Sequence, residues 1–382
     1  MKHSYARLCL AWLAVLGGAV SVALAIFVFV HWWEHRWITF PENLGNERAL
    51  NLLQSRGAVS ADALNFAVIG DINNGTRAFE KVVNRLRREQ NMAFLVLLGD
   101  CAANADARSH DYFIDEFCET DLDLPTFIVA GNHDVKPGRM EYPEFEAIYG
   151  SANFAFIHGR DLFIGLGGIH APEKLAETLT FLETTLRERR TAAKNVFVFM
   201  HYTVRASNDI PTDGIAFGED FQRLFEKHRV TYVITGHYHR LARTEVNGVT
   251  YLVTGGGGAR LRRDEFGDLG LFHHLTLIKS DGNSVSEQTI PIPPPLWPLK
   301  QLERFERWGL TTILPFGKAH PVAGALGTVL AVAVFSLGLA YLVRSRYPRG
   351  GRCQKENVRS PFRENGERMS NNSFIRPESP GR

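Results

Sequence analysis

Short apolar runs, each ending abruptly in polar residues, recur through the middle of the chain. Five of them are rich in Val, Ile and Phe, the pattern of buried strands: Phe66–Ile69, Phe94–Leu98, Phe127–Ala130, Val196–Met200 and Tyr232–Ile234. Helical spacing of apolar residues appears between them at Thr76–Gln90, Leu175–Arg189 and Phe217–Lys227. The first strand, its helix and the second strand form a β-α-β unit, whose parallel strands end at one edge of a sheet.

Beyond residue 239 the pattern changes to antiparallel hairpins. Asn247-Gly248 separates Thr244–Val246 from Val249–Val253, and this dipeptide favours a type I′ turn because both turn positions need a positive φ. A second hairpin is predicted from Leu271–Ile278 and Ser284–Ile290. The sequence therefore predicts one mixed α/β domain over residues 64–292.

Two long apolar segments flank this domain. Leu8–Val30 and Pro321–Val343 contain no charged side chain, and each is long enough to cross about 30 Å of hydrocarbon as a helix. We expect an N-terminal transmembrane anchor within residues 1–34 and a second transmembrane helix at 321–343. Ala23-Leu24-Ala25 also resembles a signal-peptidase site, but the apolar run continues to Val30, which favours an uncleaved anchor.

The distribution of Lys and Arg predicts the topology. Seven basic residues lie close to the outer ends of the two segments and three lie close to the ends that face the domain, so both termini are expected in the cytoplasm and the domain across the membrane, in the periplasm if the source is bacterial. The net charge of +2 gives no reason to expect a nucleic-acid partner.

The remaining segments connect these parts. Residues 35–63 are expected to be a linker, 293–320 a Pro-rich spacer with a short helix, and 344–382 a basic disordered tail. Leu299, Leu302, Phe305 and Trp308 recur every third residue, so this helix is expected either to lie on the membrane surface or to dock on the domain.

The polar residues at the strand ends are those that bind divalent metals. They are Asp71, Asp100, Asn132, His201, His237 and His239, and they offer hard oxygens and imidazoles without paired thiolates. Two divalent ions held by such a set polarise a phosphoryl group and activate water. Hydrolysis of a phosphate ester is the reaction class that this chemistry favours.

In order and spacing these residues resemble the calcineurin-like metallophosphoesterases. The family pattern, an Asp-x-His followed by Gly-Asp, Gly-Asn-His-Asp, His and Gly-His-x-His, appears here as Asp71-Ile72-Asn73, Gly99-Asp100, Gly131-Asn132-His133-Asp134, His201 and Gly236-His237-Tyr238-His239. The resemblance covers about 230 residues. It implies a four-layer α/β sandwich of mixed sheets, the metallo-dependent phosphatase fold, here flanked by the two transmembrane helices.

The resemblance also implies a role for each residue. Asp100 would bridge two divalent ions (Mn, Fe or Zn), Asp71 and His239 would hold the first, and Asn132, His201 and His237 the second. His133 would contact the phosphoryl oxygens and protonate the leaving group, with Asp134 orienting it. The expected reaction is attack of metal-activated hydroxide on the phosphorus of a phosphomonoester or phosphodiester. A lipid-linked phosphate is one candidate substrate, because the domain is tethered to a membrane.

One residue departs from the family pattern. Asn73 stands where the family usually has His, and an amide oxygen is a weaker ligand than imidazole. Either the first ion is bound less tightly, or Asn73 leaves a position that water fills. The alternative to an enzyme is a non-catalytic membrane scaffold or receptor with a degenerate metal site.

Three further features carry weaker expectations. Cys101 and Cys118 either pair as a disulfide or are small buried apolar residues. Gly255–Gly258 permits close backbone approach beside a substrate pocket, or forms a flexible turn. His273 and His274 are expected to be structural, because no motif surrounds them.

Overall fold

The computed structural model describes residues 9, 11–23, 25–26, 40–57, 64–169, 172–204, 218–261, 267–281, 284–313, 316 and 319–346. Within them the chain divides into two compact units, one of residues 21–330 and one of the end segments 1–20 and 331–382. Parts of the first predicted span and nearly all of the basic tail lie outside the described residues.

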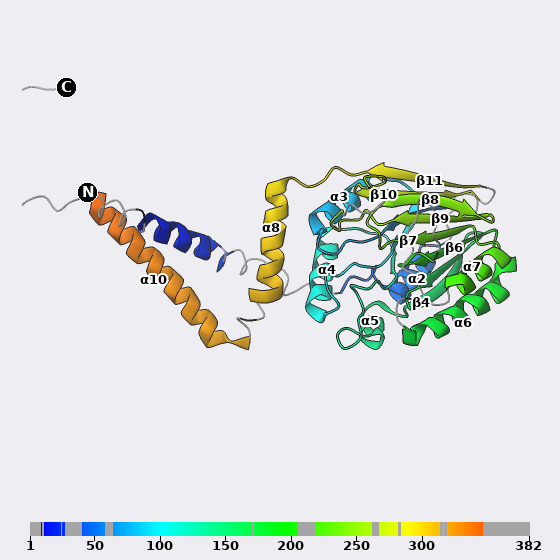
Figure 1. Ribbon diagram of the computed structural model, residues 1–382, viewed down its shortest axis with the longest axis horizontal. Coiled ribbons are helices and arrows are strands. Elements are labelled where there is room, and N and C mark those ends of the chain that lie inside the picture. Colours follow the sequence, from blue (N-terminus) through cyan, green and yellow to red (C-terminus); the bar gives the residue numbers. More distant parts are fainter. Residues whose placement is uncertain are drawn as a thin grey trace, which may run out of the picture. The chain divides into compact units, whose positions relative to one another are not determined.

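Two mixed sheets form the body of the larger unit (Figure 1). The first sheet has the strand order β11 (Val285–Pro291), β10 (His274–Ser280), β1 (Leu64–Ile69), β2 (Met92–Leu97) and β3 (Thr126–Ile128). The second has the order β4 (Asn153–His158), β5 (Asp161–Leu166), β6 (Asn195–Met200), β7 (Tyr232–Thr235), β9 (Val249–Thr254) and β8 (Leu241–Val246). All five predicted strands are present. The pairs β1–β2, β2–β3 and β6–β7 are parallel, so their carboxyl ends share an edge within each sheet.

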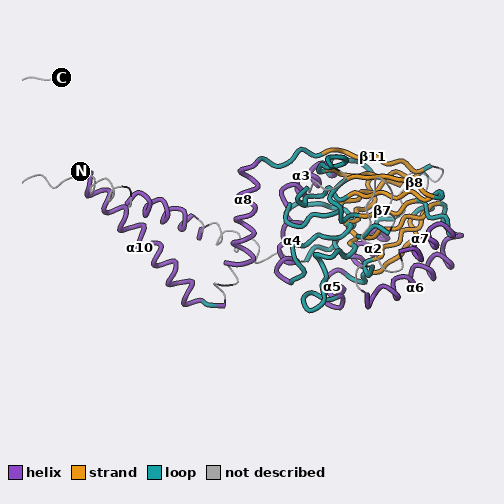
Figure 2. The backbone as a smooth tube through the Cα atoms, in the orientation of Figure 1, coloured by secondary structure: helices purple, strands orange, loops and turns teal. Residues whose placement is uncertain are grey.

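Helices lie outside the strands, as Figure 2 shows. They are α2 (Asn46–Ser55), α3 (Thr76–Leu86), α4 (Ala107–Glu119), α5 (Tyr142–Tyr149), α6 (Pro172–Arg189), α7 (Gly218–Lys227) and α8 (Trp297–Trp308), with a 3₁₀ turn at Arg190–Ala192 and a π-helical turn at Gly309–Ile313. The predicted β-α-β unit is β1-α3-β2.

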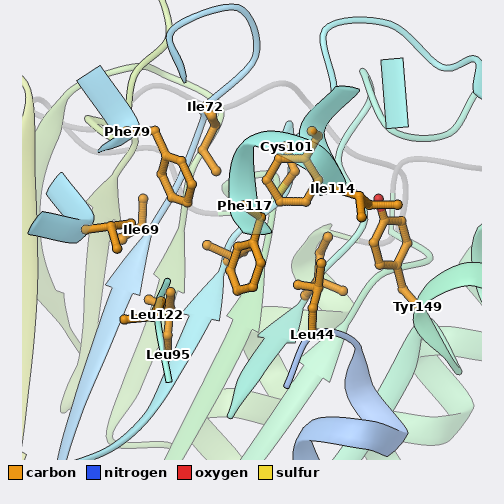
Figure 3. Packing of buried hydrophobic residues seen from close by; sticks show 14 of the residues in the cluster. Leu44, Ile69, Ile72, Phe79, Leu95, Cys101, Ile114, Phe117, Leu122 and Tyr149 are labelled. Carbon is orange, nitrogen blue, oxygen red and sulfur yellow. The ribbon is translucent and has the colours of Figure 1, made fainter. Parts of the chain in front are cut away.

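Three apolar clusters fill the spaces between four layers. The first joins α3 and α4 to the first sheet and includes Phe79, Phe117 and Leu95 (Figure 3). The second joins α6 and α7 to the second sheet. The third lies between the sheets, where the rings of Phe66 and Phe197 meet edge to face at 5.1 Å. This is the predicted mixed α/β sandwich, held by burial of apolar surface on both faces of each sheet.

Both predicted hairpins are present. Asn247 and Gly248 have φ values of 52° and 76°, as a type I′ turn between β8 and β9 requires. The hairpin β10–β11 begins at His274, three residues later than expected. The β4–β5 hairpin at the edge of the second sheet was not predicted.

The predicted linker 35–63 contains part of the domain. Leu44 is fully buried, and the α2 side chain Asn46 donates a hydrogen bond to the Ile128 carbonyl and accepts one from the Ile128 N–H. Cys101 and Cys118 are free thiols within the first apolar cluster, which excludes the disulfide and leaves the apolar alternative.

The end segments form their own unit. The helical residues 11–20 pack on the part of α10 (Pro321–Arg346) that belongs to this unit, with Gly18 against Phe335 and Gly338 against Ala14 and Val15. In the part of the chain that the structure describes, no helix has both the length and the apolar character needed to cross a membrane. The two transmembrane spans stay predictions from the sequence.

Candidate dimetal site

The site lies where the loops after β1, β2, β3, β6 and β7 meet. Hydrogen bonds connect the sheets there, among them those from the His201 ring to the Leu98 carbonyl and from the His237 backbone N–H to the Asp71 carboxylate, both at 2.8 Å. The polar residues predicted at separate strand ends are therefore brought together at one edge of the sandwich.

The backbone at this edge adopts left-handed conformations. Nine non-glycine residues of the described chain have positive φ, and five of them belong to the predicted site: Asp71 (61°), Asn73 (48°), Asp100 (53°), His237 (69°) and His239 (44°). Asn, Asp and His are the non-glycine residues that adopt left-handed backbone most readily, and such conformations concentrate at functional sites. The conformation turns these side chains away from the paths that regular strands would give them.

Two ligand groups share one carboxylate. Donor atoms of Asp100, His201 and His237 all lie within 4.8 Å of one another, and so do donor atoms of Asp71, Asp100 and His239. Asp100 is the member common to both, and it is buried. This is the arrangement that a carboxylate bridging two ions requires.

The group that contains His201 is the more closely packed of the two. His201 Nε2 lies 3.1 Å from Asn132 Oδ1, 3.2 Å from His237 Nδ1 and 3.4 Å from Asp100 Oδ1. Four donors bound to one ion through bonds of about 2.1 Å are separated by roughly 3.4 Å. The donor set therefore fits a divalent cation in both chemistry and spacing.

Backbone carbonyls fix the orientation of two imidazoles. The Nδ1 atoms of His201 and His239 contact the carbonyls of Leu98 and Arg260, at 2.8 and 2.9 Å. A ring nitrogen that donates to a carbonyl leaves the other nitrogen unprotonated and able to bind metal. For both residues that atom is Nε2, which faces Asp100 or Asp71.

The electrostatics of the site favour a cation. Burial raises the pKa of Asp71, and repulsion from Asp100 adds to the rise. For Asp100, burial also acts to raise the pKa, but attraction to His201 and His133 outweighs it and holds the pKa below its usual value. Buried carboxylates this close repel one another, and a divalent ion between them relieves the repulsion.

The side chain of Asn73 also indicates a ligand at this edge. Its Oδ1 atom is buried and has no hydrogen-bond donor among the described residues. A buried carbonyl oxygen without a partner is costly, so its presence at this edge fits a ligand or a site-bound water. Asn73 is held in place by its backbone N–H, which donates to the Asp100 carbonyl at 2.8 Å.

Glycines make room for the carboxylates. A Cβ atom on Gly236 or Gly255 would lie 2.6 or 2.5 Å from Asp71 Oδ2, and one on Gly131 would lie 2.4 Å from Asp100 Oδ1. The run Gly255–Gly258 is buried and packs on the backbone of Gly70 and Gly75, which confirms the predicted close approach.

The expected role of Asp134 is wrong. Its carboxylate accepts hydrogen bonds from the backbone N–H groups of Ala102 and Gly131, at 2.8 and 2.9 Å, and these tie together the loops after β2 and β3. Burial, followed by repulsion from Asp100, raises the pKa of Asp134 to about 7. The His133 ring is oriented instead by the carbonyl of Ala103, which lies 2.9 Å from its Nδ1 atom. The backbone N–H of His133 donates to the Asp100 carboxylate at 2.8 Å.

The sequence did not reveal the groups that hydrogen-bond to the candidate site residues and fix their orientation. The carbonyls of Leu98, Ala103 and Arg260 orient the imidazoles of His201, His133 and His239. Every residue has a backbone carbonyl, so the sequence gives no indication of which ones act in this way. Buried His110 also contributes: it bonds the Asp134 carbonyl and Tyr149 Oη, both at 2.9 Å. His273 and His274 are buried and bonded to neighbouring protein atoms, as expected for structural residues.

Comparison with known proteins gives one family match. The family described as calcineurin-like phosphoesterase matches residues 64–241. A search of curated proteins gives no match.

Similar solved structures include GAP50, the anchor in the inner membrane complex of Plasmodium (11% identity, TM-score 0.43, covering 65% of this chain and 95% of that one). A dimetal phosphatase from Danio rerio has 14% identity and a TM-score of 0.42, covering 60% of this chain and 99% of that one. A novel archaeal phosphodiesterase has 12% identity and a TM-score of 0.34, covering 59% and 100%.

Proposed function

Residues 64–241 belong to the calcineurin-like phosphoesterase family, and from this premise we propose that the protein is a dimetal phosphoesterase tethered to a membrane. The observation that carries the proposal is the sharing of Asp100 between two groups of potential metal ligands. Neither group contains a thiol, so the donors suit ions that accept oxygen and nitrogen ligands, such as Mn, Fe or Zn.

Each side chain has a defined task in this proposal. Asp71, Asn73 and His239 would hold one ion, Asn132, His201 and His237 would hold the other, and Asp100 would serve both. When bound, two ions would supply polarisation of the phosphoryl oxygens and a lowered pKa for the water that attacks phosphorus. The backbone carbonyls of Leu98 and Arg260 keep the Nε2 atoms of His201 and His239 pointed at the site, so little reorganisation is needed when substrate binds.

His133 is proposed as the proton donor to the leaving group. His133 is half-buried, and its backbone N–H donates a hydrogen bond to Asp100. Its ring Nδ1 is hydrogen-bonded to the Ala103 carbonyl, so Nε2 is the ring atom that can contact substrate. Asp134 is a positioning residue that holds the backbone on which His133 is mounted.

The membrane location rests on the sequence. The two uncharged segments and the excess of basic residues outside them support a tether with both termini in the cytoplasm. The close helix contacts at Gly18 and Gly338 are of the kind found between membrane helices. A reporter fused after Arg352 is expected to be cytoplasmic, and an extracytoplasmic reporter would contradict the topology.

Metal content together with turnover tests the proposal. The purified full chain is expected to bind about two Mn or Zn ions and to hydrolyse an aryl phosphate, with Asp100→Ala abolishing both. Asp123→Ala is the matched control, because this exposed carboxylate pairs only with Arg56 at the surface. If the wild-type chain takes up no metal under any condition, the scaffold alternative replaces the enzyme.

A further inference from the structure

The helix α8 docks on the domain through its charged side. Glu303 is buried and accepts hydrogen bonds from Thr76 Oγ1 at 3.0 Å and from the Arg77 N–H at 3.3 Å. The residue before α3, Gly75, offers no capping side chain, so Glu303 stabilises the positive end of α3 from more than 200 residues away.

The segment before α8 is fastened as well. Lys81 Nζ donates to the carbonyls of Pro293 and Pro294, at 3.4 and 3.1 Å, and Arg307 donates to the Asn74 carbonyl at 3.2 Å. Figure 1 shows α8 standing beside α3 and α4. Of the two alternatives raised by the sequence, docking on the domain is the one observed. Leu302 and Trp308 remain about half exposed on the outer side of the helix.

A cavity of about 350 Å³ lies between α8, the start of α3 and the glycine run. Its charged lining consists of Arg260, Lys300, Glu303, Arg304 and Arg307. Four cations against one carboxylate leave a formal excess of three positive charges. Glu303 interacts electrostatically with Arg307, so the excess positive charge falls on Arg260, Lys300 and Arg304.

The cations are available to a ligand. Lys300, Arg304 and Arg260 are exposed, and none of them has an ion pair with another described residue. Arg side chains in particular match the oxygens of phosphate with two parallel N–H donors. The volume of this cavity is that of a small-molecule pocket, and its charge favours an anionic group such as phosphate over an apolar one.

The cavity adjoins one half of the candidate dimetal site. Asn74, which follows Asn73, lines it, and so does Arg260, whose carbonyl holds the His239 ring. Two residues of the cavity lining are therefore linked to proposed ligands of the same half, Asn74 to Asn73 and Arg260 to His239.

We propose that this cavity binds a second phosphate group of the substrate, so that the enzyme selects molecules carrying two phosphates. The inference rests on the proposed function, and it makes α8 a substrate-recognition element. The phosphate can belong to a soluble metabolite or to a lipid headgroup.

Binding of inorganic phosphate to the metal-free full chain tests the cavity alone. After EDTA treatment, wild type and Asp100→Asn are expected to bind phosphate equally, whereas Lys300→Gln/Arg304→Gln weakens binding by about tenfold or more. Arg88→Gln/Lys227→Gln is the matched control, since both residues are exposed and lie outside the cavity. Absence of saturable binding in wild type, or equal weakening in the control, would overturn the proposal.

Kinetics then link the cavity to the substrate. In the metal-loaded enzyme, Lys300→Gln/Arg304→Gln is expected to raise KM for a sugar bisphosphate about tenfold at unchanged kcat, with KM for p-nitrophenyl phosphate changed by less than about twofold. An equal rise for both substrates contradicts the second-phosphate role. If no ester is hydrolysed but phosphate binding still depends on Lys300 and Arg304, the proposed function fails and the anion site stands.

Competition identifies the source of the phosphate. Glycerol 3-phosphate and phosphatidic acid, both in dodecylmaltoside micelles, are compared as displacers of bound inorganic phosphate. Stronger displacement by phosphatidic acid supports a lipid headgroup, and equal displacement supports a soluble molecule.

Discussion

The two halves of the candidate dimetal site differ in how firmly their ligands are held. In the half formed by Asn132, His201 and His237, the His201 Nε2 atom lies 3.1 Å from Asn132 Oδ1 and 3.2 Å from His237 Nδ1. In the half formed by Asp71, Asn73 and His239, His239 Nε2 is 3.6 Å from Asp71 Oδ1, and the Asn73 oxygen has no described partner. The first of these halves offers two imidazoles in close contact, and the other offers one imidazole and depends on the Asn73 amide.

The difference suggests unequal metal binding at one shared bridge. Imidazole binds Zn and similar ions more strongly than an amide oxygen does, so the half formed by Asp71, Asn73 and His239 is expected to lose its ion first. Because Asp100 belongs to both halves, the loss of one ion also leaves a buried carboxylate poorly compensated.

The largest effect is expected from removing one imidazole on each side. His201→Ala removes the central donor and should lower kcat/KM by about a thousandfold, whatever metal is added. His239→Ala leaves oxygen ligands in its half, so its loss of about a hundredfold should be partly restored by excess Mn. Activity titrated against added Mn distinguishes the two, and equal rescue of both variants would remove the distinction between the halves.

His133 belongs to neither half, and its removal should act on the leaving group instead. His133→Ala is expected to slow hydrolysis of an alkyl phosphate by about a hundredfold or more, because an alkoxide needs a proton as it departs. With p-nitrophenyl phosphate, whose leaving group is stable as an anion, the loss should be much smaller. Similar losses on both substrates, accompanied by loss of bound metal, would make His133 a structural residue.

Restoring imidazole at position 73 should strengthen the weaker half by a smaller factor. The φ of Asn73 is 48°, a region that His also tolerates, so Asn73→His carries little backbone cost. Zn affinity of the weaker site is expected to rise about tenfold. Metal retained after dialysis is the measurement, with Asn74→His as the neighbouring control. Unchanged retention would mean that position 73 does not contact metal.

Much of this site could be predicted from the sequence, because ligand side chains are visible in it. Asp71, Asp100, Asn132, His201, His237 and His239 follow apolar strands, and parallel strands deliver their ends to one edge. The supporting shell could not be predicted, since carbonyls such as those of Leu98 and Arg260 belong to every residue. Asp134 was misassigned because adjacency to His133 in sequence does not mean contact between the side chains.

The position of α8 shows a second limit of sequence reasoning. The period of its apolar residues correctly predicted an amphipathic helix, and the usual expectation is that the apolar side packs inward. Here buried Glu303 faces the domain, while Trp297 is 72% exposed. The start of α3 has no side-chain cap from its own segment. The hydrogen bond that Glu303 accepts there accounts for the side of α8 that docks.

The smallest expected effect concerns the carboxylates of α4, where no imidazole is among the groups that shift the pKa of Asp115. On α4, burial raises the pKa of Asp115 to about 7, with further repulsion from Asp111 and Glu119. A raised pKa means that the folded state favours the neutral acid, so its contribution to stability is complete below about pH 4 and is lost as the pH rises to about 7.

Asp115→Asn removes this penalty and tests whether repulsion alone marks a metal site. The variant is expected to be more stable than wild type by about 1–2 kcal/mol at pH 8, after allowance for partial exposure, and equally stable near pH 4. Urea unfolding at both pH values measures the difference, with exposed Asp121→Asn as the control. Added Mn should stabilise the chain through the dimetal site and leave the gain from Asp115→Asn unchanged. If Mn abolishes that gain, the α4 carboxylates also bind cations, and the imidazoles are not what distinguishes the two carboxylate clusters.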